Sequence, residues 1–272
     1  MSLYLDCNVF TIKGKSVSEN KYISIFNIWL SLCMKNAGLG PSDIIHIKMD
    51  SDTYDYCKNN MVFTALVHYN AVCPIQILLY PPPETILDGM MMRYARIDYM
   101  QDIYMYCDID ILILKPLRTL YEGIPPNTIR THIEGRLHDL NYGACFTSEE
   151  LAPISQNAPG FSSGKFIIHG KELYQHLMSM IGSIYKKDST YFTVDQPFYN
   201  KALYALNNDK YTMDLINMRH LSTNGSNYNE DTVLFDAMGM PGDGDMHYDK
   251  IINYYVLIQS NLLDKVFIKH KE

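Results

Sequence analysis

Two aspartates interrupt an otherwise apolar segment in the first half of the sequence. Asp108 and Asp110 lie within residues 103–114, where nearly all other side chains are apolar. Unpaired charges in a buried strand cost several kcal/mol, so a positive partner has to offset them. Carboxylates suit Mg²⁺ and Mn²⁺, and residues two apart in an extended strand project to one face. The pattern predicts a divalent-cation site at Asp108 and Asp110, with positions left open for a diphosphate.

A simpler interpretation of the same pair is a turn between two strands, in which both aspartates are only solvated. An Asp-x-Asp pattern is common by chance and carries little information alone. The apolar runs on both sides of the pair favour the metal site over the solvated turn.

The sequence around the two aspartates resembles the Asp-x-Asp region of GT-A fold glycosyltransferases. It is most similar to family 8, which includes glycogenin and the bacterial lipopolysaccharide galactosyltransferases. Three further segments match family motifs in the expected order. Residues 93–100 resemble an arginine-bearing helix, 161–168 a Phe-Asn-Ser-Gly motif followed by a strand, and 195–197 an Asp-Gln pair that opens a helix. The resemblance covers about residues 3–250, as a chain of short motifs.

The resemblance implies a role for each matching residue. It implies a UDP-sugar donor, a saccharide or glycoprotein acceptor, Mn²⁺ or Mg²⁺ as cofactor, and hexose transfer with retention of anomeric configuration. The implied catalytic residues are Gln196 and Asp195. The implied donor-binding residues are Arg93, Asp108, Ser163, Gly164 and Lys250, and the implied metal ligands include Asp108 and Asp110.

The third metal ligand is where the sequence departs from the family pattern. The family has a late His-x-x-Gly motif whose histidine binds the metal, and the matching residues 235–239 place Asp236 at the histidine position. A carboxylate also ligates a hard cation, so Asp236 is expected to complete the site. His247, in the loop predicted over 236–248, is the alternative ligand. A second departure is Ser162, which stands where the family has asparagine.

Some of these residues also have structural interpretations. Asp is a preferred residue before a helix, so Asp195 fits a helix cap as well as an active-site acid. Arg93 and Arg96 are expected to share one face of a helix over 85–100, where surface ion pairs are the alternative to a diphosphate contact. Residues 50–57 are expected to form a solvated loop near the nucleotide base.

The elements that must position these residues alternate between strands and helices. Such alternation favours a mostly parallel sheet with crossover helices, which binds ligands at the carboxyl ends of its strands. The alternation indicates an α/β fold, and the family resemblance implies that it is GT-A-like and Rossmann-related, as a single domain over 1–272. Its nucleotide-binding half is 1–117, and its acceptor and catalytic half, of α+β character, is 118–272. Strands are predicted over 3–12, 43–49, 75–80 and 103–114, helices over 23–34, 85–100, 171–187 and 196–207, and long loops over 121–160.

Composition and charge exclude several classes of protein. The 272 residues are 47% hydrophobic and 19% charged, as in globular proteins, and the net charge of −7 disfavours a nucleic-acid partner. No apolar run approaches the roughly 20 residues of a membrane span. The six cysteines lack zinc-site spacing and no secretory segment follows Met1, so a cytoplasmic protein with free thiols is expected. The tail 265–271 predicts at most a weak peripheral contact with anionic membranes.

Three alternatives to a retaining glycosyltransferase remain open at this stage. An inverting GT-A enzyme would need a carboxylate base that faces the anomeric carbon. A nucleotidyltransferase would carry a Gly-rich N-terminal signature, which the sequence lacks. A catalytically inactive protein that binds sugar nucleotides or glycans is suggested by Asp236 at the histidine position.

Overall fold

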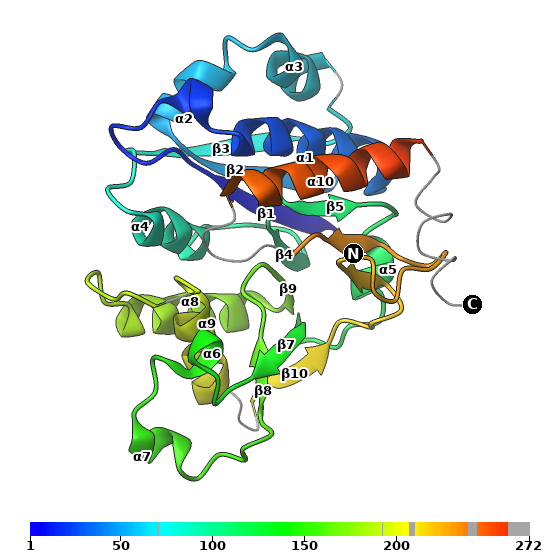
Figure 1. The fold of residues 1–272 in the computed structure, drawn as a ribbon. Coiled ribbons are helices and arrows are strands. Elements are labelled where there is room, and N and C mark those ends of the chain that lie inside the picture. Colours follow the sequence, from blue (N-terminus) through cyan, green and yellow to red (C-terminus); the bar gives the residue numbers. More distant parts are fainter. Residues whose placement is uncertain (70, 192, 207–209, 239–243, 261–272) are drawn as a thin grey trace.

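A seven-stranded sheet with the order β10-β6-β9-β4-β1-β2-β3 forms the frame of the molecule (Figure 1). Only β9 is antiparallel to its neighbours β4 and β6, and the other pairs of neighbouring strands are parallel. The prediction of a mostly parallel α/β sheet is therefore confirmed. A computed structural model describes residues 1–69, 71–191, 193–206, 210–238 and 244–260.

The central strands β1 and β4 are buried along their whole length. Parallel strands that are covered on both faces form nearly continuous apolar runs, which explains why these two were easily predicted. The sheet takes strands from both halves of the chain. Its strands are β1 (Leu3–Val9), β2 (Ile44–Asp50), β3 (Ile75–Tyr80), β4 (Ile103–Cys107), β6 (Thr128–Thr131), β9 (Lys165–His169) and β10 (Thr212–Leu215).

Helices cover both faces of this sheet and divide the core in two. Figure 1 shows α1 and α10 side by side over one face and α8 and α9 together below. Trp29 of α1 and Ile251 of α10 lie in one apolar cluster, whereas Tyr174 of α8 and Phe198 of α9 lie in the other. The helices are α1 (Tyr22–Asn36), α2 (Ser51–Cys57), α3 (Met61–Thr64), α4 (Ile86–Met91), α5 (Arg118–Tyr121), α6 (Leu140–Gly143), α7 (Ser148–Leu151), α8 (Lys171–Ile184), α9 (Gln196–Leu206) and α10 (Gly244–Gln259).

The strand predicted over 103–114 is divided at the two aspartates. The chain leaves the main sheet after Cys107, turns, and enters β5 in a second sheet of order β11-β12-β5. An apolar run does not distinguish one long strand from two short ones. Here its first part forms β4 in the main sheet and its last part forms β5 in the second sheet. The strands of the second sheet are β5 (Ile111–Ile113), β11 (Leu221–Thr223) and β12 (Leu234–Asp236).

Four other predicted segments differ from the structure. The loop predicted over 236–248 includes Asp236, the last residue of β12, and the first residues of α10, which begins at Gly244. Residues 50–57 form α2 rather than a loop, because the buried Asp50 side chain accepts hydrogen bonds from the N–H groups of Asp52 and Thr53. The helix over 85–100 is replaced by α4 and a 3-10 turn at Met92–Tyr94. The loops over 121–160 contain β6, α6, α7 and a small antiparallel pair, β7 (Ile133–Arg136) and β8 (Pro159–Phe161).

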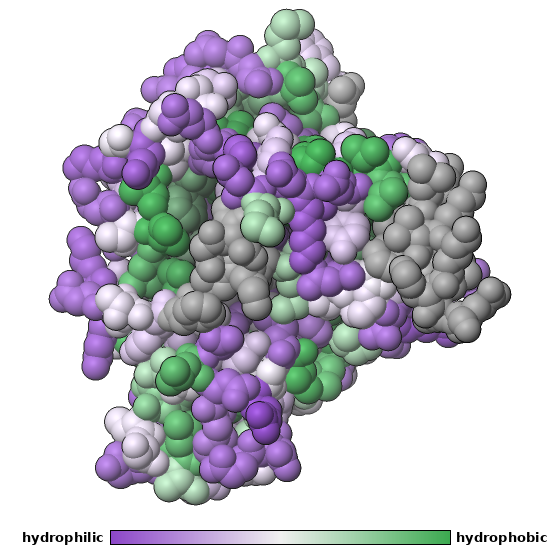
Figure 2. All heavy atoms as spheres, viewed as in Figure 1, coloured by the Kyte–Doolittle hydropathy of each residue, from purple (hydrophilic) through white to green (hydrophobic). Residues whose placement is uncertain are grey.

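The surface is mostly polar on the face shown in Figure 2, with apolar side chains around α3. The most exposed of these are Met61 and Val62, at 87% and 54%. Within the described ranges, no helix is both long and apolar enough to cross a bilayer. The tail 265–271 lies outside the described residues, so its contact with membranes stays a prediction.

All six cysteines are free thiols, as the sequence predicted. Five are buried, and Cys145 is partly exposed. Burial raises the pKa of the Cys145 thiol to about 11.

Candidate active site

The two aspartates stand at the turn that joins the two sheets. The Asp108 N–H donates to the Gly164 carbonyl oxygen at 2.8 Å, and the Asp108 carbonyl accepts from Ile111 N–H at 3.2 Å. The side chains of Asp108 and Asp110 are 26% and 28% exposed. The backbone is thus the turn of the simpler interpretation, but the carboxylates lie at the carboxyl end of a buried parallel strand, where ligands bind.

The Asp108 carboxylate is held by two side chains of the protein. Its Oδ1 accepts from the Tyr106 hydroxyl at 2.7 Å and lies 3.2 Å from Arg93 Nη2. Burial raises the pKa of this carboxyl to about 7, the Arg93 guanidinium opposes the rise, and the charge of Asp110 adds to it.

Arg93 is a buried link between Asp108 and Asp195. Its side chain is only 1% exposed, and its Nη1 lies 3.5 Å from Asp195 Oδ2. Nη1 also donates to the Ser163 carbonyl oxygen at 3.1 Å, and the guanidinium lies 4.9 Å from the ring centre of Tyr106. Because the α4 helix ends early, Arg93 and Arg96 do not share a face, and Arg96 bonds to Ser179 at the surface instead. Arg93 therefore orients the carboxylates of Asp108 and Asp195.

Asp195 and Gln196 lie at the start of α9, beside the same arginine. Asp195 Oδ2 accepts from the Tyr94 hydroxyl at 2.6 Å, so this side chain bonds to a core tyrosine. Gln196 Oε1 accepts from the Ser163 N–H at 3.3 Å. The preceding Val194 has φ 55°, a left-handed conformation that is unusual for a β-branched residue. Ser163 thereby connects Gln196 to Arg93.

Gly164 permits the close approach of the Asp108 side chain. A Cβ on Gly164 would lie 2.6 Å from Asp108 Oδ2, well inside contact distance. A larger residue at position 164 would therefore force the Asp108 carboxylate to move, and direct contact of Gly164 with a donor stays a prediction.

His247 lies against Asp110, at the start of α10. Its Nε2 is 3.0 Å from Asp110 Oδ2, and its side chain is 7% exposed. Neighbouring ligands of an octahedral ion at 2.0–2.1 Å lie about 3.0 Å apart, so this pair fits two positions of one coordination sphere. Tyr22, which sequence reasoning missed, has its ring centre 6.4 Å from that of His247, with the two planes tilted by 43°. No local motif marked Tyr22, because it reaches the site only through the packing of α1 on α10.

Asp236 has a different partner from the one expected. Its Oδ2 lies 2.5 Å from Nζ of Lys165, which also contacts Glu134 Oε1 at 3.0 Å. The carboxylate is thus neutralised by a lysine of β9. Gly239, the other end of the family-like motif, lies outside the described residues.

The side chains available as ligands at this site suit a divalent cation, although the structure does not bring three of them into contact. Asp110 and His247 are in contact and Asp108 precedes Asp110 by two residues, which gives two carboxylates and an imidazole. Among the residues that the structure describes, no three His, Cys, Asp or Glu side chains form a ready-made cluster for a metal. Lys250, one turn after His247, donates to the Met238 carbonyl oxygen at 2.6 Å.

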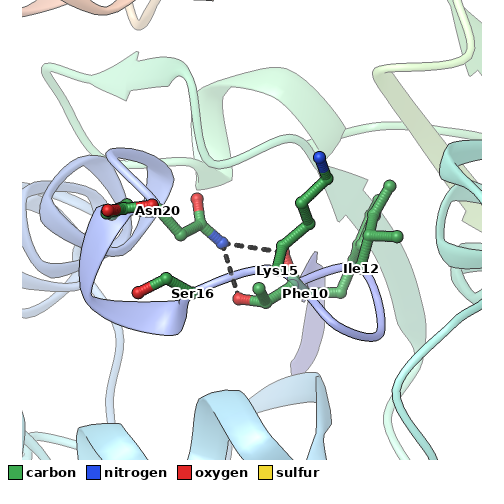
Figure 3. A pocket seen from close by; sticks show the side chains of 7 residues that line it. Phe10, Ile12, Lys15, Ser16 and Asn20 are labelled. Carbon is green, nitrogen blue, oxygen red and sulfur yellow. Dashed lines mark hydrogen bonds between the residues drawn. The ribbon is translucent and has the colours of Figure 1, made fainter.

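A cavity of about 340 Å³ opens beside the loop that follows β1 (Figure 3). Asn20 shapes its wall by donating to the Phe10 carbonyl and to Thr11 Oγ1 at 2.9 and 2.8 Å. Since β1 is parallel to β4, this loop leaves the same edge of the sheet as the two aspartates. No sequence motif marked this cavity. The cavity is lined by Phe10, Thr11, Ile12, Lys15, Ser16, Glu19 and Asn20.

Comparison with solved structures identifies the fold. Mouse xyloside xylosyltransferase 1, in its apo form, is 12% identical and superposes with a TM-score of 0.54 over 87% of this chain and 98% of its own. The galactosyltransferase LgtC, in complex with donor and acceptor sugar analogues, is 13% identical, with a TM-score of 0.55 over 93% and 96% of the two chains. An active-site mutant of LgtC, in which a glutamine is replaced by glutamate, has a TM-score of 0.54 at 12% identity over the same shares.

These similarities show that the chain has the mixed α/β fold of GT-A glycosyltransferases. Neither a protein-family model nor a curated protein sequence matches the chain. At such low identity the likeness establishes the fold, and the chemistry has to be argued from the site.

Proposed function

We propose that this protein is a metal-dependent glycosyltransferase that moves a hexose from a UDP-sugar to a hydroxyl of a saccharide or protein-linked glycan. One observation carries the proposal. Asp110 and His247 meet at the carboxyl edge of the sheet, beside an Asp108 that Arg93 connects to Asp195. In this proposal the arrangement would hold a cation and a sugar next to each other, and the fold shared with glycosyltransferases supports it.

The metal ligands in this proposal are Asp108, Asp110 and His247. Asp236, the ligand first expected from the motif, is assigned to the ion pair with Lys165 instead. A cation bound here would supply positive charge for the diphosphate that leaves as the glycosidic bond breaks. Arg93 keeps Asp108 oriented toward this position, so we assign it a positioning role rather than direct contact with the diphosphate.

The donor would lie along the edge of the sheet from the cavity to α9. We assign the nucleoside to the cavity near Asn20, since the loop after β1 leads directly into Tyr22 beside the metal ligands. Gln196 and Asp195 would then orient the hexose and stabilise its developing positive charge. The acceptor hydroxyl attacks from the side of the leaving diphosphate, which takes its proton, and this gives retention. Lys250 is placed to approach the diphosphate only if it leaves the Met238 carbonyl.

The structure bears on two of the alternatives. An inactive binding protein was suggested by Asp236 at the histidine position, and His247 beside Asp110 removes the reason for that suggestion. For an inverting enzyme, Glu134 is a buried acid near the site, but Lys165 holds its carboxylate at 3.0 Å. A retaining transferase is therefore the function that the geometry supports best.

Calorimetric titration with UDP tests the proposal. UDP should bind at least about 10-fold more tightly with Mn²⁺ than with a chelator, because the metal offsets the charge between the carboxylates and the diphosphate. Asp110→Asn should remove most of this gain, whereas Asp98→Asn at the exposed surface should retain it. A screen of UDP-sugars for release of UDP then identifies the donor. Equal UDP affinity with and without metal would contradict the proposal.

A further inference from the structure

Lys165 is a fully buried cation to which the proposed reaction gives no task. It is 0% exposed on β9, a strand that is otherwise apolar up to its terminal histidine. Its ammonium contacts Asp236 at 2.5 Å, Glu134 at 3.0 Å and Ser162 Oγ at 3.3 Å. Burial opposes the charge, but the two carboxylates outweigh it and raise the pKa of Lys165 above its usual range. The lysine is therefore permanently charged beside the site.

The ion pair between Lys165 and Asp236 lies beside the turn at residues 108–110 that contains the two aspartates. Lys165 pairs with Cys107 on β4, the residue before Asp108. Asp236 pairs with Ile111 on β5, the residue after Asp110. One partner belongs to the main sheet and the other to the second sheet, so the pair bridges the two sheets at the turn. Asp236 is thus placed near the metal ligands but directed to the lysine.

We infer that Lys165 decides which side chain completes the metal site: it holds Asp236 in an ion pair and leaves the third position to His247. This inference rests on the proposed metal-dependent function. With Asp236 as a ligand, the site would hold three carboxylates. With Lys165 in place, it holds two carboxylates and a neutral imidazole, and the diphosphate meets less negative charge. Lys165 is a positioning residue, since it acts through Asp236.

The test compares how much His247→Ala weakens Mn²⁺ binding in two backgrounds of equal charge, the wild type and a double variant. The cluster of Lys165, Glu134 and Asp236 has two carboxylates and one ammonium, and hence a net charge of −1. The double variant Lys165→Met/Glu134→Gln keeps that charge but frees Asp236 from its partner. Mn²⁺ binding is measured by calorimetry without nucleotide, and circular dichroism confirms that each variant is folded.

We expect the loss of Mn²⁺ affinity caused by His247→Ala to depend strongly on whether Lys165 is present. In the wild-type background, His247→Ala should weaken Mn²⁺ binding at least about 10-fold. In the double variant the same change should cost less than about 3-fold, because the Asp236 carboxylate replaces the imidazole. Adding Asp236→Asn to the double variant should restore the large loss.

Each contrary outcome has a distinct meaning. An equal loss from His247→Ala in both backgrounds would overturn the role of Lys165 and leave the proposed function standing. Absence of Mn²⁺ binding by the wild-type protein would overturn the proposed function, and this inference with it. Asp236→Asn alone gives an independent test that needs no change at Lys165. It should leave Mn²⁺ affinity within about 2-fold, and a 10-fold loss would show that Asp236 is a ligand despite the lysine.

Discussion

At the scale of single residues, the site is built by side chains that orient other side chains. Arg93 is 1% exposed and contacts Asp108 and Asp195, so in the proposed function it would act on a donor through these two carboxylates. A guanidinium suits this task because its fixed fork of donors can satisfy several acceptors at once. The motif named Arg93 as a donor-binding residue, which stays a prediction, but a sequence pattern does not distinguish a residue that touches a diphosphate from one that holds its neighbours.

Gly164→Ala tests the close contact beneath Asp108. The new Cβ would lie 2.6 Å from Asp108 Oδ2, so the carboxylate has to move. We expect a loss of Mn²⁺-dependent UDP affinity of at least about 10-fold by calorimetry. Gly182→Ala is the matched control, since nothing lies within 4 Å of the added atom in α8. That control should raise stability by roughly 0.5–1 kcal/mol and leave UDP binding unchanged. Unchanged affinity in Gly164→Ala would exclude a role for the Asp108 position.

Gln196→Ala tests the assignment of Gln196 to the sugar. Its Oε1 accepts from Ser163 N–H at 3.3 Å, and its side chain lies beside Asp195 rather than at the cavity near Asn20. We expect kcat to fall at least about 100-fold while the Kd for UDP changes less than about 3-fold, because a lost transition-state contact lowers kcat selectively. Steady-state kinetics and UDP calorimetry separate the two effects. Full turnover in the variant would remove Gln196 from the catalytic residues.

At the scale of elements, the aspartate turn is the main difference between the predicted and observed structures. The apolar run over 103–114 predicted one strand, whereas β4 and β5 belong to different sheets. Both short strands are buried, so nothing in the run marks the break except the aspartates themselves. The geometric reason for the predicted metal site, two residues on one face of a strand, was wrong, and the metal site itself stays a prediction.

Asp50 shows how a polar strand end can be structural. Its Oδ1 caps α2 through Asp52 and Thr53, and its Oδ2 accepts from Thr11 N–H at 2.8 Å. Because Thr11 lines the cavity, this buried carboxylate connects α2 to the loop that we assign to the nucleoside. A sequence cannot show that this acidic residue also accepts a hydrogen bond from Thr11, because that N–H donor lies 39 residues away in the chain.

Replacement of Asp50 tests this connection. Asp50→Ala leaves three N–H groups without their acceptor and should lower the free energy of unfolding by roughly 2–4 kcal/mol. Asn60→Ala is the control, because Asn60 caps α3 at an exposed position and should cost about 0.5–1 kcal/mol. Urea unfolding measures both values. Equal losses in the two variants would show that Asp50 contributes no more than an ordinary cap.

At the scale of the whole molecule, the fold was more predictable than the site. The buried strands at 3–9 and 103–107 and the helices α1, α8 and α9 follow from apolar periodicity and were found. Lys165, Glu134 and Tyr22 were not, because their partners are distant in the sequence. Lys165 contacts Glu134 and Asp236, which are 31 and 71 residues away, and the Tyr22 ring contacts His247 of α10. Asp236 and His247 were both named, and which of the two binds metal stays a prediction.

The buried cluster around Lys165 predicts how acid affects the whole molecule. Burial alone would raise the pKa of Glu134, but Lys165 and hydrogen bonds lower it to about 2. A carboxyl whose pKa is lowered by folding stabilises the folded state at any pH above its ordinary pKa of 4.5. This stabilisation is lost as the pH falls from about 4.5 toward 2. Glu134→Gln should therefore be less stable than the wild type at pH 7, by roughly 2–3 kcal/mol. The difference in free energy of unfolding between this variant and the wild type should be smaller at pH 3.5.

Urea unfolding at several pH values measures this gap. Glu84→Gln is the control, because Glu84 pairs with Lys13 at the surface, where both side chains are more than half exposed. Exposed pairs contribute about 0–1 kcal/mol, so this variant should follow the wild type at every pH. A gap for Glu134→Gln that stays constant from pH 7 to pH 3.5 would contradict the ion-pair account.

The placement of the six thiols has a practical consequence for studies of this protein. Thiolate, not thiol, reacts with alkylating reagents, and burial keeps Cys145 protonated near neutral pH even though it is partly exposed. The folded chain should therefore resist alkylation, and each thiol becomes reactive only when its surroundings open. Cys7, Cys33 and Cys107 report on the main sheet and α1, whereas Cys145 reports on the second half. Intact mass after a short alkylation pulse thus counts opened regions without any introduced label.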